Sequence, residues 1–206
     1  KFTDTARPVI MPRFTTPPLY FAHGHSNICD SASGSLRFSC NGMVLYDSNC
    51  AKMDNGDSLV PVKAYTHNAF PLAMYTQSTL ILPKGNSGLY YVIVCTISDS
   101  MYTYWYTNPL GDGRFPHNLL MYHIVDINAN GGLGKVISKN NVLLKNVEMQ
   151  KIGMMACRHA NGRDWWLLKQ GRYDTNEVYR FLVKPDTIEG PWIQTFSAPH
   201  YSPRDL

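Results

Sequence analysis

The stretch Arg158–Gln170, RHANGRDWWLLKQ, places a polar turn directly before two adjacent tryptophans. Its Asn161-Gly162 pair is a hairpin signal, because Asn and Gly readily adopt the positive φ angles of tight β-turns. Trp165 and Trp166 then open a strand, in which successive side chains point to opposite faces of the sheet. The stretch therefore predicts a β-hairpin with one tryptophan packed on each side of a sheet and the charged Arg163-Asp164 in a solvated turn.

The same pattern occurs earlier in the chain, which indicates an internal repeat. LILPKGNSGLYYVIV (Leu80–Val94) corresponds to MMACRHANGRDWWLLK (Met154–Lys169), and YHIVDINANGGLGKVI (Tyr122–Ile137) corresponds to YRFLVKPDTIEGPWIQ (Tyr179–Gln194). Together with a shorter first unit, these runs predict three four-stranded antiparallel units, at about 26–60, 77–145 and 150–198. Such units in series are typical of β-propeller blades, and a β-sandwich is the competing all-β interpretation.

Three blades are fewer than the four to eight that closed propellers usually contain. An open stack of three would leave a hydrophobic blade face and unpaired strand edges exposed. We therefore expect the remaining propeller blades, or another protein chain, to complete the structure. The first residue, Lys1, fits a processed or partly represented chain.

The composition narrows the function classes. Hydrophobic residues make up 44% of the chain, aromatic residues 12% and charged residues 17%, which favours a β-rich globular protein over a disordered one. The net charge is +4, but the basic residues are scattered, so the sequence does not predict nucleic-acid binding. No apolar stretch reaches the roughly 20 residues of a membrane-spanning helix.

The five cysteines divide into two groups. Cys29, Cys40 and Cys50 lie close together in the sequence and could supply one disulfide. Cys95 and Cys157 lie in apolar, strand-like runs, so we expect both to be buried thiols.

One segment resembles the start of a calcium-binding loop. Asp126, Asn128 and Asn130 have the alternating spacing of such loops, but the twelfth position is Ile137 where the pattern requires a bidentate Glu. Strand-like runs also flank the segment, where helices would be expected. The sequence therefore predicts a strand–strand turn here and no bound metal.

No catalytic motif is found. The chain lacks a phosphate-binding loop and a Gly-x-Ser-x-Gly nucleophile turn, and no pair of carboxylates stands out for glycoside cleavage. We therefore predict no catalytic residues and no cofactor.

The insertion Ser98–His117, SDSMYTYWYTNPLGDGRFPH, interrupts the second unit and is rich in aromatic residues. We interpret it as an aromatic loop that contacts another molecule: a partner chain, a later region of the same protein or a surface glycan. The alternative is a loop that packs on its own propeller face. The candidate binding residues are Tyr102, Tyr104, Trp105, Tyr106 and Phe115.

Three segments together resemble a family of secreted β-propeller proteins from Bacteroidota. They are ICDSASGSLRFSCNGMVLYDSNCAKMDNGDSL (Ile28–Leu59), YHIVDINANGGLGKVISKNNVLL (Tyr122–Leu144) and RHANGRDWWLL (Arg158–Leu168), in the order in which that family has them. Its members typically continue with further blades, and many carry a C-terminal sorting or gliding-type domain exported by the type IX secretion system. The resemblance implies a secreted or cell-surface protein, associated with the outer membrane through regions outside this chain, and it supplies no catalytic residues.

The sequence thus predicts a non-enzymatic secreted or cell-surface module for binding or assembly. One alternative is a propeller hydrolase or lyase that acts on extracellular glycans. Another is a structural subunit of a surface filament or secretion-linked assembly.

Overall fold

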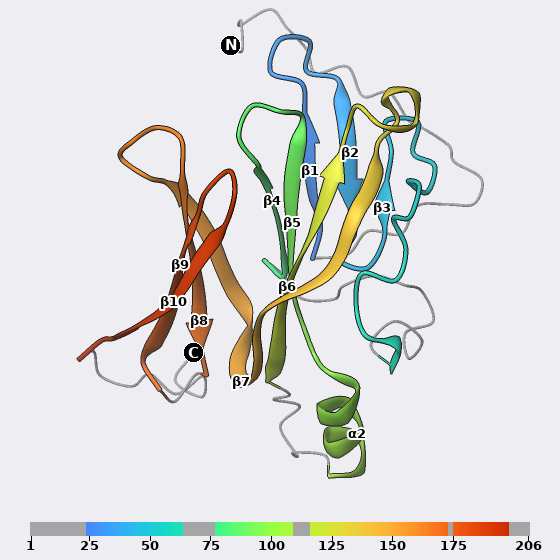
Figure 1. Ribbon diagram of the computed structural model, residues 1–206. Coiled ribbons are helices and arrows are strands. Elements are labelled where there is room, and N and C mark those ends of the chain that lie inside the picture. The colour runs from blue at the N-terminus through green and yellow to red at the C-terminus, as the bar shows by residue number, and fades with distance from the viewer. Residues whose placement is uncertain (1–23, 64–76, 109–115, 173–174, 198–206) are drawn as a thin grey trace, which may run out of the picture.

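Alternation of apolar and polar residues produces a protein made mostly of antiparallel β-strands. The computed structural model describes residues 24–63, 77–108, 116–172 and 175–197 (Figure 1). Within these ranges the strands form two antiparallel sheets, which confirms the all-β class.

The smaller sheet has the order β1-β2-β3 and the larger sheet the order β10-β9-β8-β7-β6-β5-β4. The strands of the smaller sheet are β1 (Ser26–Cys29), β2 (Leu36–Cys40) and β3 (Leu45–Tyr46). Those of the larger sheet are β4 (Thr79–Pro83), β5 (Leu89–Thr96), β6 (His117–Asp126), β7 (Lys135–Arg158), β8 (Trp165–Gly171), β9 (Glu177–Val183) and β10 (Ile188–Thr195). A helix, α2 (Asp99–Thr107), lies between β5 and β6, and the short 3-10 turn η1 (Asn130–Gly132) precedes β7.

The long strand β7 divides the larger sheet into two halves. Its first part pairs with β6, its last part pairs with β8, and Met149 pairs with both neighbours. Figure 1 shows β7 descending beside β6, turning sharply and rising again beside β8. The sheet is therefore folded along β7, so that the β4–β6 half faces the β8–β10 half.

Side-chain alternation along β5 connects the two hydrophobic cores. Val92 and Val94 point into a core shared with the smaller sheet. Tyr91, Ile93 and Cys95 point the other way, into a core shared with β7, β8 and β9. The β4–β6 half is therefore covered on both faces, which explains why β5 reads as an almost unbroken apolar run.

A buried lysine stabilises the bend in β7. Between Met149 and Met154 the strand carries extra residues that have no register partner on β8. Lys169 of β8 is fully buried, and its Nζ donates hydrogen bonds to the carbonyl oxygens of Gln150 (2.5 Å) and Ile152 (2.6 Å). Lys169 thus donates to carbonyl groups that the irregular ladder leaves open, and these carbonyls in turn satisfy donors of its buried ammonium group.

Several sequence expectations are refined by this fold. The described strands do not close into a ring, so the all-β class is shown while a propeller is not. The expected second and third units are not separate sheets, because β7 runs through both. The hairpin at Asn161-Gly162 is confirmed: β7 and β8 pair on either side of it, and Gly162 has a φ of 72°.

The cysteine expectations are partly wrong. Cys95 is buried as expected, but Cys157 is exposed, because its side chain lies on the uncovered face of the folded sheet. All five cysteines lie in the described ranges and none forms a disulfide, so the expected bridge among Cys29, Cys40 and Cys50 is not found.

Two histidines of β6 are buried in the larger sheet. His123 is inaccessible to solvent, and its Nδ1 accepts a hydrogen bond from the backbone N–H of Asn140 (3.2 Å). Burial, reinforced by the positive charge of Lys139, lowers its pKa to about 4. Burial also lowers the pKa of His117 to about 3, with a further contribution from the charge of Lys169. Both side chains are therefore neutral in the folded protein at pH values where an unfolded histidine is protonated.

This difference predicts acid sensitivity. Between pH 7 and pH 5 we expect the free energy of unfolding to fall by on the order of 2 kcal/mol for each of His117 and His123, because only the unfolded chain gains the protons. The loss begins near the ordinary histidine pKa of 6.5 and continues to about 4 for His123. Urea melts at pH 7, 6 and 5 measure it. In the variant His123→Gln the dependence should be weaker, and equal stability of the parent protein at pH 7 and 5 would contradict the prediction.

The opposite orientations of neighbouring β8 residues give a second prediction. Leu167 is fully buried in the core between the two halves, whereas Leu168 is half-buried on the other face. Leu167→Ala should cost about 2–5 kcal/mol of unfolding free energy, as for other large-to-small core changes. Leu168→Ala is the matched control and should cost less than about 1 kcal/mol. Equal losses in denaturant melts would show that both faces of β8 are covered.

Candidate binding face

The face of β7–β10 that points away from the β4–β6 half has no described segment over it; it is called the outer face below. Strand register places its side chains in three cross-strand rows. They are Cys157, Trp166, Leu182 and Glu189; then Met155, Leu168, Arg180 and Trp192; and then Gln170, Val178 and Gln194.

Two tryptophans form the most prominent part of the outer face. The rings of Trp166 and Trp192 meet edge to face with centroids 6.1 Å apart, and the ring of His159 lies 5.6 Å from Trp166. Trp165 lies on the opposite face, against the inner core, so the predicted split of the two tryptophans is confirmed. Trp192 is 42% exposed and Met155 is 53% exposed, so both large side chains remain in contact with water.

Arg180 lies within this apolar surface, between Leu168 on β8 and Trp192 on β10. Its Nε is buried and has no hydrogen-bond partner among the described residues. Lys184, which directly follows β9, is paired with Glu189 at 2.6 Å. The outer face thus presents one positive charge without a described counter-ion, with an apolar side chain on each side of it along its row.

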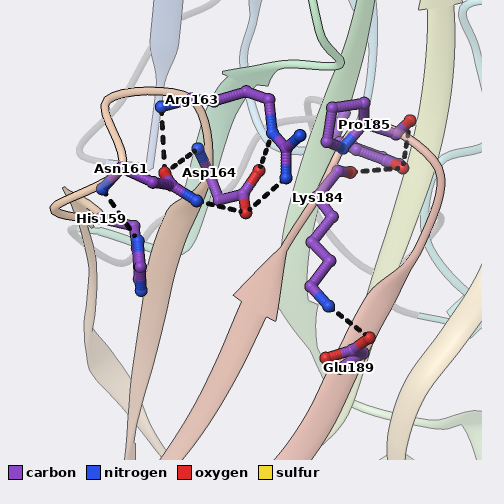
Figure 2. A network of polar contacts seen from close by, with 8 residues as sticks. His159, Asn161, Arg163, Asp164, Lys184, Pro185 and Glu189 are labelled. Carbon is purple, nitrogen blue, oxygen red and sulfur yellow. Dashed lines mark hydrogen bonds and ion pairs between the residues drawn. The ribbon is translucent and has the colours of Figure 1, made fainter.

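The β7–β8 hairpin at one end of the outer face is rigidly built (Figure 2). Oδ1 of Asn161 accepts hydrogen bonds from the backbone N–H groups of Arg163 and Asp164, both at 3.0 Å. The side chain of Arg163 donates twice to the carboxylate of Asp164, at 2.7 and 3.1 Å, and Nδ2 of Asn161 donates to the same carboxylate at 2.8 Å. These contacts hold the turn that starts β8, and with it the position of Trp166.

The expected solvated turn is therefore wrong for Asp164. Its residue exposure is only 2%, whereas Arg163 covers it from the solvent side. The hydrogen bonds from Arg163, together with that from Asn161, lower the pKa of Asp164 to about 2. The carboxylate is a structural element of the hairpin.

The sequence predicted that the aromatic insertion is a loop. This is wrong for Asp99–Thr107, which form helix α2. Ser98 caps the helix: its Oγ accepts the backbone N–H of Met101 at 3.2 Å, and Asn118 forms hydrogen bonds with both Ser98 N and Ser98 Oγ. Asp99 adds a negative charge in the first turn, where it is favourable. The segment Ser98-Asp99-Ser100 is a helix-start signal in the sequence. It was not recognised because the aromatic residues that follow it suggested a loop.

The five predicted binding residues of the insertion are only partly brought together. Tyr102 and Trp105 are half-buried, and Tyr104 is 56% exposed with its ring 5.0 Å from that of Trp105. The side chain of Tyr106 and all of Phe115 lie outside the described residues. Figure 1 shows α2 at the end of β6, apart from β8–β10, so these aromatics and the outer face are different surfaces. Their role in binding stays a prediction.

The calcium-like segment is a turn stabilised by its own side chains. Oδ1 of Asp126 accepts the backbone N–H of Asn128 at 2.9 Å, and Nδ2 of Asn128 donates to the carbonyl of Ser87 at 3.3 Å. Asn130 begins η1 with a φ of 52°. In the described part of the chain no group of three or more His, Cys, Asp or Glu residues is arranged to hold a metal ion.

Three carboxyl groups of the described residues have lowered pKa values, which is the opposite of what a general acid requires. Backbone and side-chain hydrogen bonds, first from Ser33, lower the pKa of Asp30, and a hydrogen bond from Lys52 lowers that of Asp57. Hydrogen bonds likewise lower the pKa of Asp164. A carboxylic acid that protonates a leaving group at neutral pH needs a raised pKa. These three carboxylates therefore serve as ion-pair and turn-forming groups.

Comparison with known proteins identified no similar protein. No protein-family model, curated protein or solved structure matches the chain. None of the helices in the described ranges has the length and hydrophobicity needed to cross a membrane.

The outer face should bind an uncharged apolar dye. We expect Nile red to bind the isolated chain and the variant Trp192→Lys to lose most of this binding, since the new charge interrupts the apolar surface. Trp192 is not in the core, so the melting midpoint should change little. Tyr104→Lys on α2 is the matched control and should bind the dye normally. The reverse result would place the binding surface on α2.

Proposed function

We propose that the chain is a non-enzymatic binding and assembly module whose outer face is covered by a further β-sheet. The observation that carries this proposal is the apolar outer face with its two tryptophans. A secreted or cell-surface location, as a propeller protein of the Bacteroidota type, is part of the proposal and rests on the sequence resemblance alone.

The packing inside the chain supports a sheet as the partner. The smaller sheet covers one face of the β4–β6 half, and the β8–β10 half covers the other. Each contact joins two faces of alternating apolar residues. The outer face has the same alternation, so a third contact of the same kind would bury it. Each large apolar side chain fully buried there contributes about 1.5–3 kcal/mol.

The sheet faces support assembly more directly than catalysis. The outer face combines thioether, indole and aliphatic side chains with the guanidinium of Arg180, two glutamines and the Lys184–Glu189 ion pair. The three carboxylates with lowered pKa values hold turns or ion pairs elsewhere. Large exposed apolar patches are typical of protein interaction surfaces. Helix α2, with Tyr104 on its surface, provides a second point of contact for a partner or a glycan.

Site-specific photo-crosslinking in cells that make the whole protein tests this proposal. A photoreactive phenylalanine analogue replaces Met155 or Trp192 on the outer face, and Lys52, on an exposed part of the other end of the chain, serves as the control position. We expect positions 155 and 192 to crosslink to the same β-strand segment, identified by mass spectrometry of the joined peptides. Crosslinking no stronger than at position 52 would contradict the proposal.

A further inference from the structure

The arginines of the described residues differ in how their charge is compensated. Arg37, Arg163 and Arg172 each form an ion pair with a carboxylate, at 2.6–2.7 Å. Arg158 lies over the ring of Trp165, 5.3 Å from its centre. Arg180 has neither kind of partner among the described residues, although its Nε is buried.

Because of the position of Arg180, the lack of a partner for its charge would destabilise any interface formed over it. Leu168 and Trp192 flank it in cross-strand register, so apolar side chains lie on both sides of it along its row of the outer face. Covering the outer face with a purely apolar sheet would remove water from the guanidinium and leave its donors without acceptors. A buried charged group left in that way destabilises an interface by several kcal/mol.

We propose that the β-sheet covering the outer face carries an Asp or Glu whose carboxylate pairs with Arg180. This inference rests on the proposed function and specifies the partner's chemistry. A carboxylate matches the planar fork of an arginine with two parallel hydrogen bonds. A phosphate or a nucleic-acid backbone would need several cations together, whereas Lys184, the other cation of this face, is already paired with Glu189.

The first test compares two small probes of equal shape, 3-phenylpropanoate and its neutral amide. The phenyl ring of each can contact Trp166 and Trp192, and only the acid can pair with Arg180. We expect the acid to bind about ten-fold more tightly, which corresponds to about 1.4 kcal/mol. The signal of the Arg180 Nε–H in a nitrogen–proton NMR spectrum should shift with the acid and not with the amide.

Two variants make this comparison specific. In Arg180→Gln the preference for the acid should disappear while weak binding of both probes remains. Arg158→Gln removes an arginine from the opposite face of the same sheet and should leave the preference unchanged. Equal affinities of the acid and the amide for the parent protein would overturn the carboxylate inference and leave the apolar binding face intact. Failure of both probes to bind would count against the outer face as a binding surface and so against the proposed function as well.

The crosslinked segment gives an independent test on the natural partner. The strand joined to positions 155 and 192 should carry an Asp or Glu among the side chains of its apolar face. Replacing that residue with Asn or Gln should weaken the association as much as Arg180→Gln does, and the double variant should lose little more. A crosslinked strand without an acidic residue on that face would refute the inference while supporting the proposed function.

Discussion

The structure depends on the burial of the β4–β6 half-sheet from both sides. Because side chains alternate along β5, its even-numbered valines meet the smaller sheet and its odd-numbered neighbours meet the β8–β10 half. Neither core can form without this half-sheet, and polar residues on its strands, such as His117 and His123, are therefore buried with it. The sheets are therefore stacked in layers. The β8–β10 half covers one face of the β4–β6 half and leaves its own other face, the outer face, uncovered by the described residues.

The features that follow from local chemistry were predictable. Asn161-Gly162 specifies its hairpin through backbone preference alone, and the alternation rule then places Trp165 and Trp166 on opposite faces. The correspondence between the two longer units likewise identified which strands pair as hairpins. Such signals act over a few residues, so a sequence reveals them without knowledge of distant contacts.

The features that depend on distant contacts were not predictable in the same way. Lys169 reads as the polar end of a strand, and its burial follows only from the carbonyls that a bend in β7 leaves open. Cys157 has the neighbours of a buried residue, yet its face has no described cover. Arg180 becomes notable only when its apolar cross-strand neighbours are known. Asp164 was misjudged because a neighbouring arginine shields it.

The shared strand β7 has a consequence for how the protein unfolds. In a chain of repeated units, each unit usually has its own strands, so an end unit can open while its neighbour stays intact. Here the hydrogen bonds of β6 and of β8 are made to one continuous strand, and Lys169 fixes the point where the two ladders meet. Loss of the β8–β10 half would expose the core that Met149 and Met154 of β7 share with β5. The larger sheet should therefore behave as a single cooperative unit, with amide hydrogens on both halves exchanging through the same opening event.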